Sequence, residues 1–141
     1  MTTTKKPDLK VWKDIPLGGV VESGTSEHFH TGGWRSKVPV WQKQNCIQCM
    51  TCWAFCPDNA IKVVDGAKGK ERGEFDYDFC KGCGICPEEC PQNNKIFKEL
   101  KAKDANLKGS PSTFTGTPGF NEKAAILFVG LKEAKDKFNI K

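Results

Sequence analysis

Short hydrophobic runs alternate with polar and glycine-rich segments along this chain. The runs at residues 38–41 and 60–64 predict two β-strands, because they are rich in β-branched and aromatic residues. The polar segment at 65–73 predicts a turn after the second strand. Residues 74–77 and 94–97 are expected to lead into and out of a second, related half. The middle of the chain is therefore expected to hold two copies of a strand–loop–short helix–strand unit.

The last part of the chain, residues 98–141, has a different pattern. Residues 98–108 are charged and predict a helix, whereas residues 109–120 are rich in Gly, Pro, Ser and Thr and predict a flexible linker. Asn121 is a candidate N-cap for a final helix. The apolar stripe of that helix consists of Leu127, Leu131, Ala134 and Phe138. This helix either packs on its own domain or docks into a partner, and the linker favours docking because it lets the helix reach away.

The first part of the chain, residues 1–37, is an arm punctuated by paired glycines. It carries too many apolar residues for a disordered leader, and we expect it to lie over the central domain or over a partner. His28 and His30 flank an aromatic residue, and we interpret them as part of a solvated loop rather than a metal site. The predicted organisation is an arm at 1–37, a central domain at 38–97 and a helical extension at 98–141.

Length and charge narrow the class of protein. The chain has 141 residues, enough for one domain, and a formal net charge of +5. Its lysines are scattered rather than gathered in one patch, so nucleic-acid binding is not favoured. No apolar run approaches the length of a membrane span, which predicts a soluble protein without a membrane partner. The N-terminus has no apolar signal region, which argues against export.

Eight cysteines provide the strongest signal, because they form two runs of identical spacing and none lies elsewhere. Each run reads Cys-x₂-Cys-x₂-Cys-x₃-Cys-Pro, first at residues 46–57 and again at 80–91. This is the bacterial pattern for two [4Fe–4S] clusters, in which the fourth cysteine of each run ligates the other cluster. The crossed assignment gives cluster I the ligands Cys46, Cys49, Cys52 and Cys90, and cluster II the ligands Cys80, Cys83, Cys86 and Cys56.

Other interpretations of the cysteines fit less well. A disulfide framework suits an exported chain, and free buried thiols would not repeat at a fixed offset. Two zinc sites are the main alternative, but structural zinc usually uses two separated pairs of cysteines. Exposed iron–sulfur clusters imply a reducing cytoplasm and anaerobic metabolism. We therefore predict an electron carrier of α+β class, with a ferredoxin-type pseudo-twofold (βαβ)₂ fold around two clusters, an extended N-terminal arm and a C-terminal helical tail.

Two further motifs resemble one family. Thr-Gly-Gly-Trp-Arg stands at residues 31–35, and Phe-Asp-Tyr-Asp-Phe-Cys-Lys-Gly-Cys-Gly-Ile-Cys stands at residues 75–86. Together with the first cysteine run, they resemble the delta subunit of the pyruvate and 2-oxoacid:ferredoxin oxidoreductases over about residues 16–92. The chain departs from this family after the second run, where the family continues Cys-Pro-x-x-Ala-Ile and this chain has Cys-Pro-Gln-Asn-Asn-Lys.

The resemblance implies a role inside a larger enzyme. Thiamine diphosphate, Mg²⁺ and coenzyme A are expected only in partner subunits, which decarboxylate a 2-oxoacid, most often pyruvate. Electrons would then pass through the two clusters of this chain to an external ferredoxin. The chain itself would hold no catalytic residue. A freely diffusing ferredoxin is the alternative from another class, although such carriers are usually smaller and acidic, and a zinc-stabilised interaction module is a third.

Overall fold

The computed structural model describes residues 10–20, 23–67, 69–114 and 118–140. The chain divides into two compact units at the junction of His30 and Thr31. Residues 31–141, called the core unit below, contain both cysteine runs and every strand of the described residues. The C-terminal extension therefore belongs to the same unit as the cysteine runs.

The first unit, considered by itself, has two short 3₁₀ turns within its described residues, Trp12–Asp14 and Thr25–His28. Its large apolar side chains are exposed, with Trp12 at 78% and Leu17 at 97%. Lys13 covers one face of the Trp12 ring, 5.5 Å from its centroid. The expectation that this arm lies over another surface stays a prediction.

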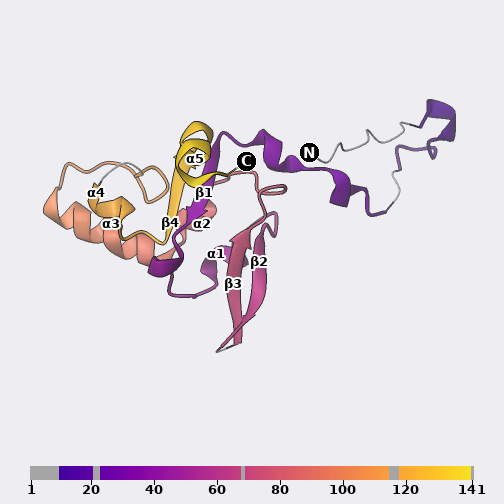
Figure 1. Ribbon diagram of the computed structural model, residues 1–141. Coiled ribbons are helices and arrows are strands. Elements are labelled where there is room, and N and C mark those ends of the chain that lie inside the picture. The colour runs from indigo at the N-terminus through magenta and orange to yellow at the C-terminus, as the bar shows by residue number, and fades with distance from the viewer. Residues whose placement is uncertain (1–9, 21–22, 68, 115–117, 141) are drawn as a thin grey trace. The chain divides into compact units, whose positions relative to one another are not determined.

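The first sheet of the core unit joins segments from its two ends. β1 (Lys37–Trp41) pairs antiparallel with β4 (Ile126–Gly130), and Pro39 lies opposite Phe128 (Figure 1). A two-stranded sheet has a free edge on each strand, so the missing N–H of this proline is tolerated. The strand predicted at residues 38–41 is confirmed, and its partner comes from the segment expected to be a helix.

The second sheet is a hairpin of β2 (Ile61–Gly66) and β3 (Gly69–Phe75). Its register shifts between Ile61, opposite Phe75, and Val63, opposite Arg72. The strand predicted at 60–64 is confirmed. The turn predicted at 65–73 is wrong for most of its length, because residues 69–72 pair with residues 63–66 as a hairpin, with Asp65 opposite Lys70 and Gly66 opposite Gly69.

Residues 94–97, expected as a strand, lie instead within α3 (Pro91–Lys103). Pro91 occupies the first turn, where its missing N–H removes no helical hydrogen bond. Ile96 and Phe97 are buried, and Leu100 packs beside them one turn later. This spacing is helical, and a window of four residues is too short to distinguish it from a strand. The helix expected at 98–108 is confirmed only as far as Lys103.

The C-terminal segment is also corrected. Residues 126–129, expected in the last helix, form β4, and α5 (Leu131–Phe138) begins only after it. Along β4, Leu127 and Val129 pack into one apolar cluster while Ile126 packs into another, which is the alternation of a strand. Residues 126–129 are four consecutive buried apolar residues, and such a run fits a buried strand as well as a helix. The helical spacing of Leu127 with the later apolar residues therefore did not identify its structure.

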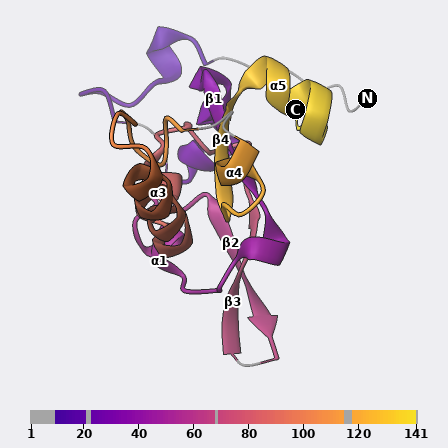
Figure 2. The same cartoon turned by 90° about the vertical axis from the view of Figure 1, so that its left-hand side faces the viewer.

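Of the linker predicted at 109–120, residues 115–117 lie outside the described residues. The described parts on both sides of them pack on the core unit. Phe120 is fully buried, and Phe114 packs edge-to-face between it and Phe97, with ring centroids 5.9 and 5.5 Å away. These contacts bring α4 (Pro118–Asn121) against α3, as Figures 1 and 2 show. The C-terminal segment, which was expected to dock into a partner, therefore packs on the chain's own domain.

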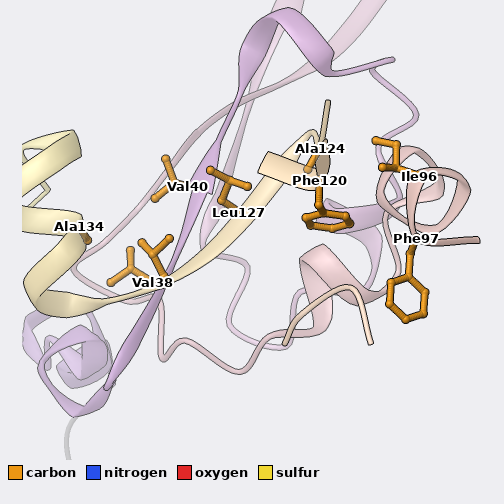
Figure 3. Close-up of a cluster of buried hydrophobic side chains, with 9 residues drawn as sticks. Val38, Val40, Ile96, Phe97, Phe120, Ala124, Leu127 and Ala134 are labelled. Atoms are coloured by element: carbon orange, nitrogen blue, oxygen red, sulfur yellow. The ribbon is translucent and has the colours of Figure 1, made fainter. Parts of the chain in front are cut away.

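One apolar cluster unites these elements. Figure 3 shows Val38 and Leu127 of the β1–β4 sheet between Ala134 of α5 and the residues Ile96 and Phe97 of α3. All five are at most 9% exposed, and burial of the four side chains larger than Ala134 stabilises by about 1.5–3 kcal/mol each. The fold class is α+β, as predicted, with two small antiparallel sheets and several short helices. No helix in the described ranges is long and apolar enough to cross a bilayer.

Candidate iron–sulfur centres

The first cysteine run forms a tight loop that enters a one-turn helix. Gln48 and Met50 adopt left-handed backbone, with φ of 55° and 60°, and α1 (Thr51–Ala54) follows directly. Residues other than glycine rarely adopt this backbone conformation, which costs them about 1–2 kcal/mol each. The Gln48 side chain offsets part of this cost, because its Oε1 accepts a hydrogen bond of 3.0 Å from the backbone N–H of Arg72.

The second cysteine run has the same backbone form. Gly82 and Gly84, at the positions of the two left-handed residues in the first loop, have φ of 66° and 82°, and α2 (Ile85–Glu88) follows. A Cβ atom on Gly82 would overlap the carbonyl oxygen of Lys37, so glycine is required there for space as well as conformation. The two loops are therefore structural repeats, as their spacing predicts.

The eight thiols are all free and differ in exposure. Those of Cys52, Cys80, Cys86 and Cys90 are buried, those of Cys46 and Cys56 are half-buried, and those of Cys49 and Cys83 are exposed. The exposed member is the second cysteine of each run. Each loop thus has one thiol exposed to solvent, while its other thiols are buried or half-buried.

Electrostatic interactions link each fourth cysteine to the opposite run. Cys90 interacts with Cys46 and Cys49, which belong to the first run, and also with Cys52. Cys56 interacts in the same way with thiols of the second run, namely Cys80 and Cys86. Cys86 and Cys52 also interact across the two groups. Each fourth cysteine therefore lies near thiols of the opposite run.

Burial raises the pKa of the Cys52, Cys80, Cys86 and Cys90 thiols above the ordinary value. Two arginines oppose this effect, since Arg72 lowers the pKa of Cys52 and Arg35 lowers that of Cys80. Without a metal these thiols hold their protons at neutral pH. A bound metal centre replaces those protons and stabilises the thiolates.

The second group of thiols faces a small cavity. Cys56, Cys80, Cys83 and Cys86 line it together with apolar groups, among them Ile61. Four thiols within eleven residues fit a four-iron cluster better than structural zinc, which usually uses two separated pairs of cysteines.

Comparison with known proteins agrees with this geometry. A family model described as a 4Fe-4S dicluster domain matches residues 40–97. The chain is 49% identical over 85 residues to pyruvate synthase subunit PorD of Thermotoga maritima, covering 60% of this chain and 82% of the relative. It is 47% identical over 76 residues to PorD of Methanothermobacter marburgensis, covering 53% and 84%. The chain belongs to the PorD family.

A relative with a different named substrate is also similar. Ketoisovalerate oxidoreductase subunit VorD of Pyrococcus furiosus is 42% identical over 63 residues, which cover 44% of this chain and 55% of that relative. The resemblance to delta subunits of 2-oxoacid oxidoreductases, inferred from two motifs and the cysteine runs, is thereby confirmed. The segment matched by the dicluster model ends inside α3, so β4 and α5 lie outside it.

In this PorD-family chain the two diagnostic motifs contact each other. The Thr31 hydroxyl donates to the carbonyl of Phe79 at 3.1 Å, and the Gly32 N–H donates to the carbonyl of Asp78 at 2.8 Å. Arg35 Nη1 donates to the carbonyls of Gly32, Tyr77 and Cys80. This brace fixes the backbone where the second cysteine run begins, which gives the Thr-Gly-Gly-Trp-Arg motif a physical role.

Sequence reasoning missed two buried residues near the thiols. Arg72 was assigned to a polar turn, and Asn93 to the sequence that follows the second run. Both are at most 2% exposed in the structure. A long polar residue between glycines and charges carries no signal of burial, so no feature of the sequence identified Arg72. Asn93 was missed as well, because the equivalent asparagine of the first Cys-Pro-x-Asn sequence, Asn59, is exposed and the shared sequence carries no signal of burial.

Proposed function

We propose that this chain is the electron-transfer subunit of a 2-oxoacid:ferredoxin oxidoreductase, with pyruvate as the substrate of the whole enzyme. The relatives named pyruvate synthase subunit PorD support the assignment of pyruvate. The observation that carries the redox role is the presence of both cysteine runs in the segment matched by the 4Fe-4S dicluster domain. We infer a grouping of Cys90 with the first run and Cys56 with the second, which their electrostatic interactions support. Such exchange of the fourth ligand is typical of proteins with two [4Fe–4S] clusters.

The proposed ligands follow from this grouping. Cluster I is held by Cys46, Cys49, Cys52 and Cys90, and cluster II by Cys80, Cys83, Cys86 and Cys56. When bound, each cluster takes up and releases one electron at a time. Backbone and side-chain groups of this chain tune the thiolates: the Ala60 N–H donates to Cys56 Sγ and the Thr51 hydroxyl donates to Cys49 Sγ, both at 3.3 Å. The short helices and buried walls limit the access of water to both sites.

The chemistry on the 2-oxoacid belongs to other subunits in this proposal. They hold thiamine diphosphate and Mg²⁺, form the acyl-coenzyme A product and deliver electrons singly to this chain. An external ferredoxin takes the electrons, and the complex works in the reducing cytoplasm. This chain contributes no catalytic residue to the carbon chemistry.

Exposed apolar side chains beside the first cysteine run support a subunit rather than a free carrier. Ile47, Trp53 and Phe55 are 59%, 41% and 56% exposed, and all three lie within or next to the first loop. Large apolar groups on a surface often mark a protein contact. A partner subunit that covers them would also bring its own redox centre close to the exposed edge of cluster I.

The test is native purification of the chain from its own cells under anaerobic conditions. Co-elution with larger subunits, about eight irons per chain and ferredoxin reduction with pyruvate are expected. Ketoisovalerate and phenylglyoxylate complete the substrate panel, since relatives carry those names. Elution of the iron-bearing chain alone at 15.6 kDa would favour the free ferredoxin, and zinc without iron would favour the interaction module.

A further inference from the structure

Arg72 lies on β3 with its side chain buried to 2% exposure. Among the described residues, no protein atom accepts a hydrogen bond from its Nε, Nη1 or Nη2. A guanidinium carries five N–H donors on these three atoms and cannot be deprotonated inside a protein. The chain therefore maintains a buried positive charge whose side-chain donors have no acceptor among the described residues.

Two aromatic rings hold this charge in place. The guanidinium carbon of Arg72 is 4.1 Å from the centroid of the Trp41 ring and 4.4 Å from that of Phe75. Contact with ring faces attracts a cation, but it satisfies none of the N–H donors, which point outward from the edges of the guanidinium plane. The rings therefore fix the plane and leave its edges for another acceptor.

The rings that hold this plane belong to a cluster that packs around the thiols. Cys52, Cys86 and Cys90 belong to it with Phe75, and Trp41, Cys46 and Cys56 border it. The backbone N–H of Arg72 donates to Gln48, which stands between Cys46 and Cys49 in the loop. This backbone contact ties Arg72 to the first run.

The other buried arginine, Arg35, provides a contrast. Its Nη1 donates to three backbone carbonyls near the second run, so its hydrogen bonds serve to hold the backbone. Arg72 differs because its side-chain donors have no such carbonyl partners among the described residues, which leaves them available to sulfur.

We propose that Arg72 is a tuning residue for the cluster bound by Cys46, Cys49, Cys52 and Cys90, and that it makes this cluster the better electron acceptor of the two. This inference rests on the proposed function. Four thiolates and an oxidised [4Fe–4S]²⁺ core carry a net negative charge, which one added electron increases. A fixed cation that donates hydrogen bonds to sulfur stabilises the reduced form more than the oxidised form and raises the potential.

The consequence is a direction for electron transfer inside the chain. With both clusters bound, the charge and donors of Arg72 would favour reduction of the cluster beside it over reduction of the other cluster, with no proton taken up or released. The low dielectric around a buried charge strengthens this effect, and no carboxylate among the described residues pairs with Arg72 to cancel it. Electrons at equilibrium therefore rest on the first cluster.

The test is an anaerobic redox titration of the full, cluster-loaded chain, followed by EPR. Arg72→Met removes the charge and the donors, and Lys62→Met is the matched control, since Lys62 is a cation on the neighbouring strand with a side chain 63% exposed. Cys49→Ala and Cys83→Ala assign the two signals, because each removes one exposed ligand. Iron and sulfide contents show whether each variant is loaded.

In Arg72→Met we expect the equilibrium constant for reduction of the first cluster to fall at least tenfold. For one electron this equals a fall of about 59 mV in its reduction potential. The equilibrium constant for reduction of the second cluster should change by less than threefold in Arg72→Met. In Lys62→Met the constants of both clusters should change by less than threefold. A fully loaded Arg72→Met with an unchanged first potential would overturn the inference, as would equal falls in both potentials.

Arg72→Gln is the second variant if Arg72→Met does not take up iron. It keeps a polar side chain of similar length without the charge, and the same tenfold loss is expected at the first cluster. Failure of both variants to hold that cluster would also overturn the inference, because Arg72 would then be needed for assembly rather than tuning. Absence of iron from the unaltered chain would instead refute the proposed function, so the two failures are distinguishable.

Discussion

Asn93, at the start of α3, holds the first residues of the last strand through its side chain. Its Oδ1 accepts hydrogen bonds from the backbone N–H groups of Ala125, at 2.8 Å, and Ile126, at 3.2 Å. Its Nδ2 donates to the carbonyls of Ile126, at 2.7 Å, and Pro87, at 3.2 Å. One fully buried amide therefore connects α2, α3 and the start of β4.

Replacement of Asn93 by Ala is expected to destabilise the core unit by roughly 3 kcal/mol, because it leaves several buried backbone groups without partners. Chemical unfolding of the loaded chain measures the loss. Asn106→Ala is the control, since Asn106 is exposed, and it should change the free energy of unfolding by less than about 0.5 kcal/mol. Equal stability of the two variants would contradict the role of Asn93.

The same contact explains where sequence reasoning went wrong. The first run continues from Cys56 through Pro57 directly into Ala60 and Ile61, where β2 begins. The second run has its Ala and Ile at residues 125–126, after α3 and α4. In the second run, α3 and α4 separate the cysteines from the corresponding strand, β4. The local sequence pattern does not reveal this strand, because β4 pairs with β1 at the other end of the unit.

The cysteine spacing, by contrast, fixed the local fold of both loops. Four cysteines at that spacing impose the same left-handed turns whether the residues are Gln48 and Met50 or two glycines. The partners that support the loops lie far away in sequence, such as Arg35 beside Cys80 and Arg72 beside Cys52. Such contacts depend on tertiary packing, which composition and periodicity do not encode.

Leu127 tests whether the C-terminal segment is part of the core. It is 5% exposed within the main apolar cluster, so Leu127→Ala should lower the free energy of unfolding by about 3 kcal/mol. Leu17→Ala is the matched control, because Leu17 is 97% exposed, and it should have almost no effect in thermal unfolding of the chain. A harmless Leu127→Ala would restore the view of a detachable tail.

The adjacent glycines of the Thr-Gly-Gly-Trp-Arg motif should respond differently to the same change. A Cβ atom on Gly32 would overlap the carbonyl oxygens of Tyr77 and Asp78, whereas one on Gly33 meets no atom within 4 Å. Gly32→Ala should therefore break the brace at the second run, at a cost of about 2–3 kcal/mol. Gly33→Ala should be neutral. Thermal unfolding and iron content of both variants provide the measurement, and similar losses in the two would refute the brace.

Removal of a fourth cysteine should damage the cluster of the opposite run. Cys56→Ala is expected to reduce the EPR signal of the cluster held by Cys80, Cys83 and Cys86, while the other cluster remains loaded. Cys90→Ala should do the reverse, and the pair serve as controls for each other. Selective loss of the first-run cluster in Cys56→Ala would show that the ligands are not exchanged.

Iron loading should weaken as the pH falls. Burial raises the pKa of Cys52, Cys80, Cys86 and Cys90, so the folded, metal-free chain holds four protons at neutral pH that the loaded chain has lost. Loading therefore releases protons and is favoured by high pH, with up to about a tenfold change in affinity per pH unit for each proton.

This dependence is measured with an iron chelator at pH 6.5 and pH 8.0, after correction for the protonation of the chelator itself. The chelator concentration that removes half of the iron should be at least tenfold lower at pH 6.5. Circular dichroism of the loaded chain at both pH values controls for unfolding, which would also release iron. Equal chelator midpoints with intact structure would mean that the buried thiols already lack their protons in the metal-free chain.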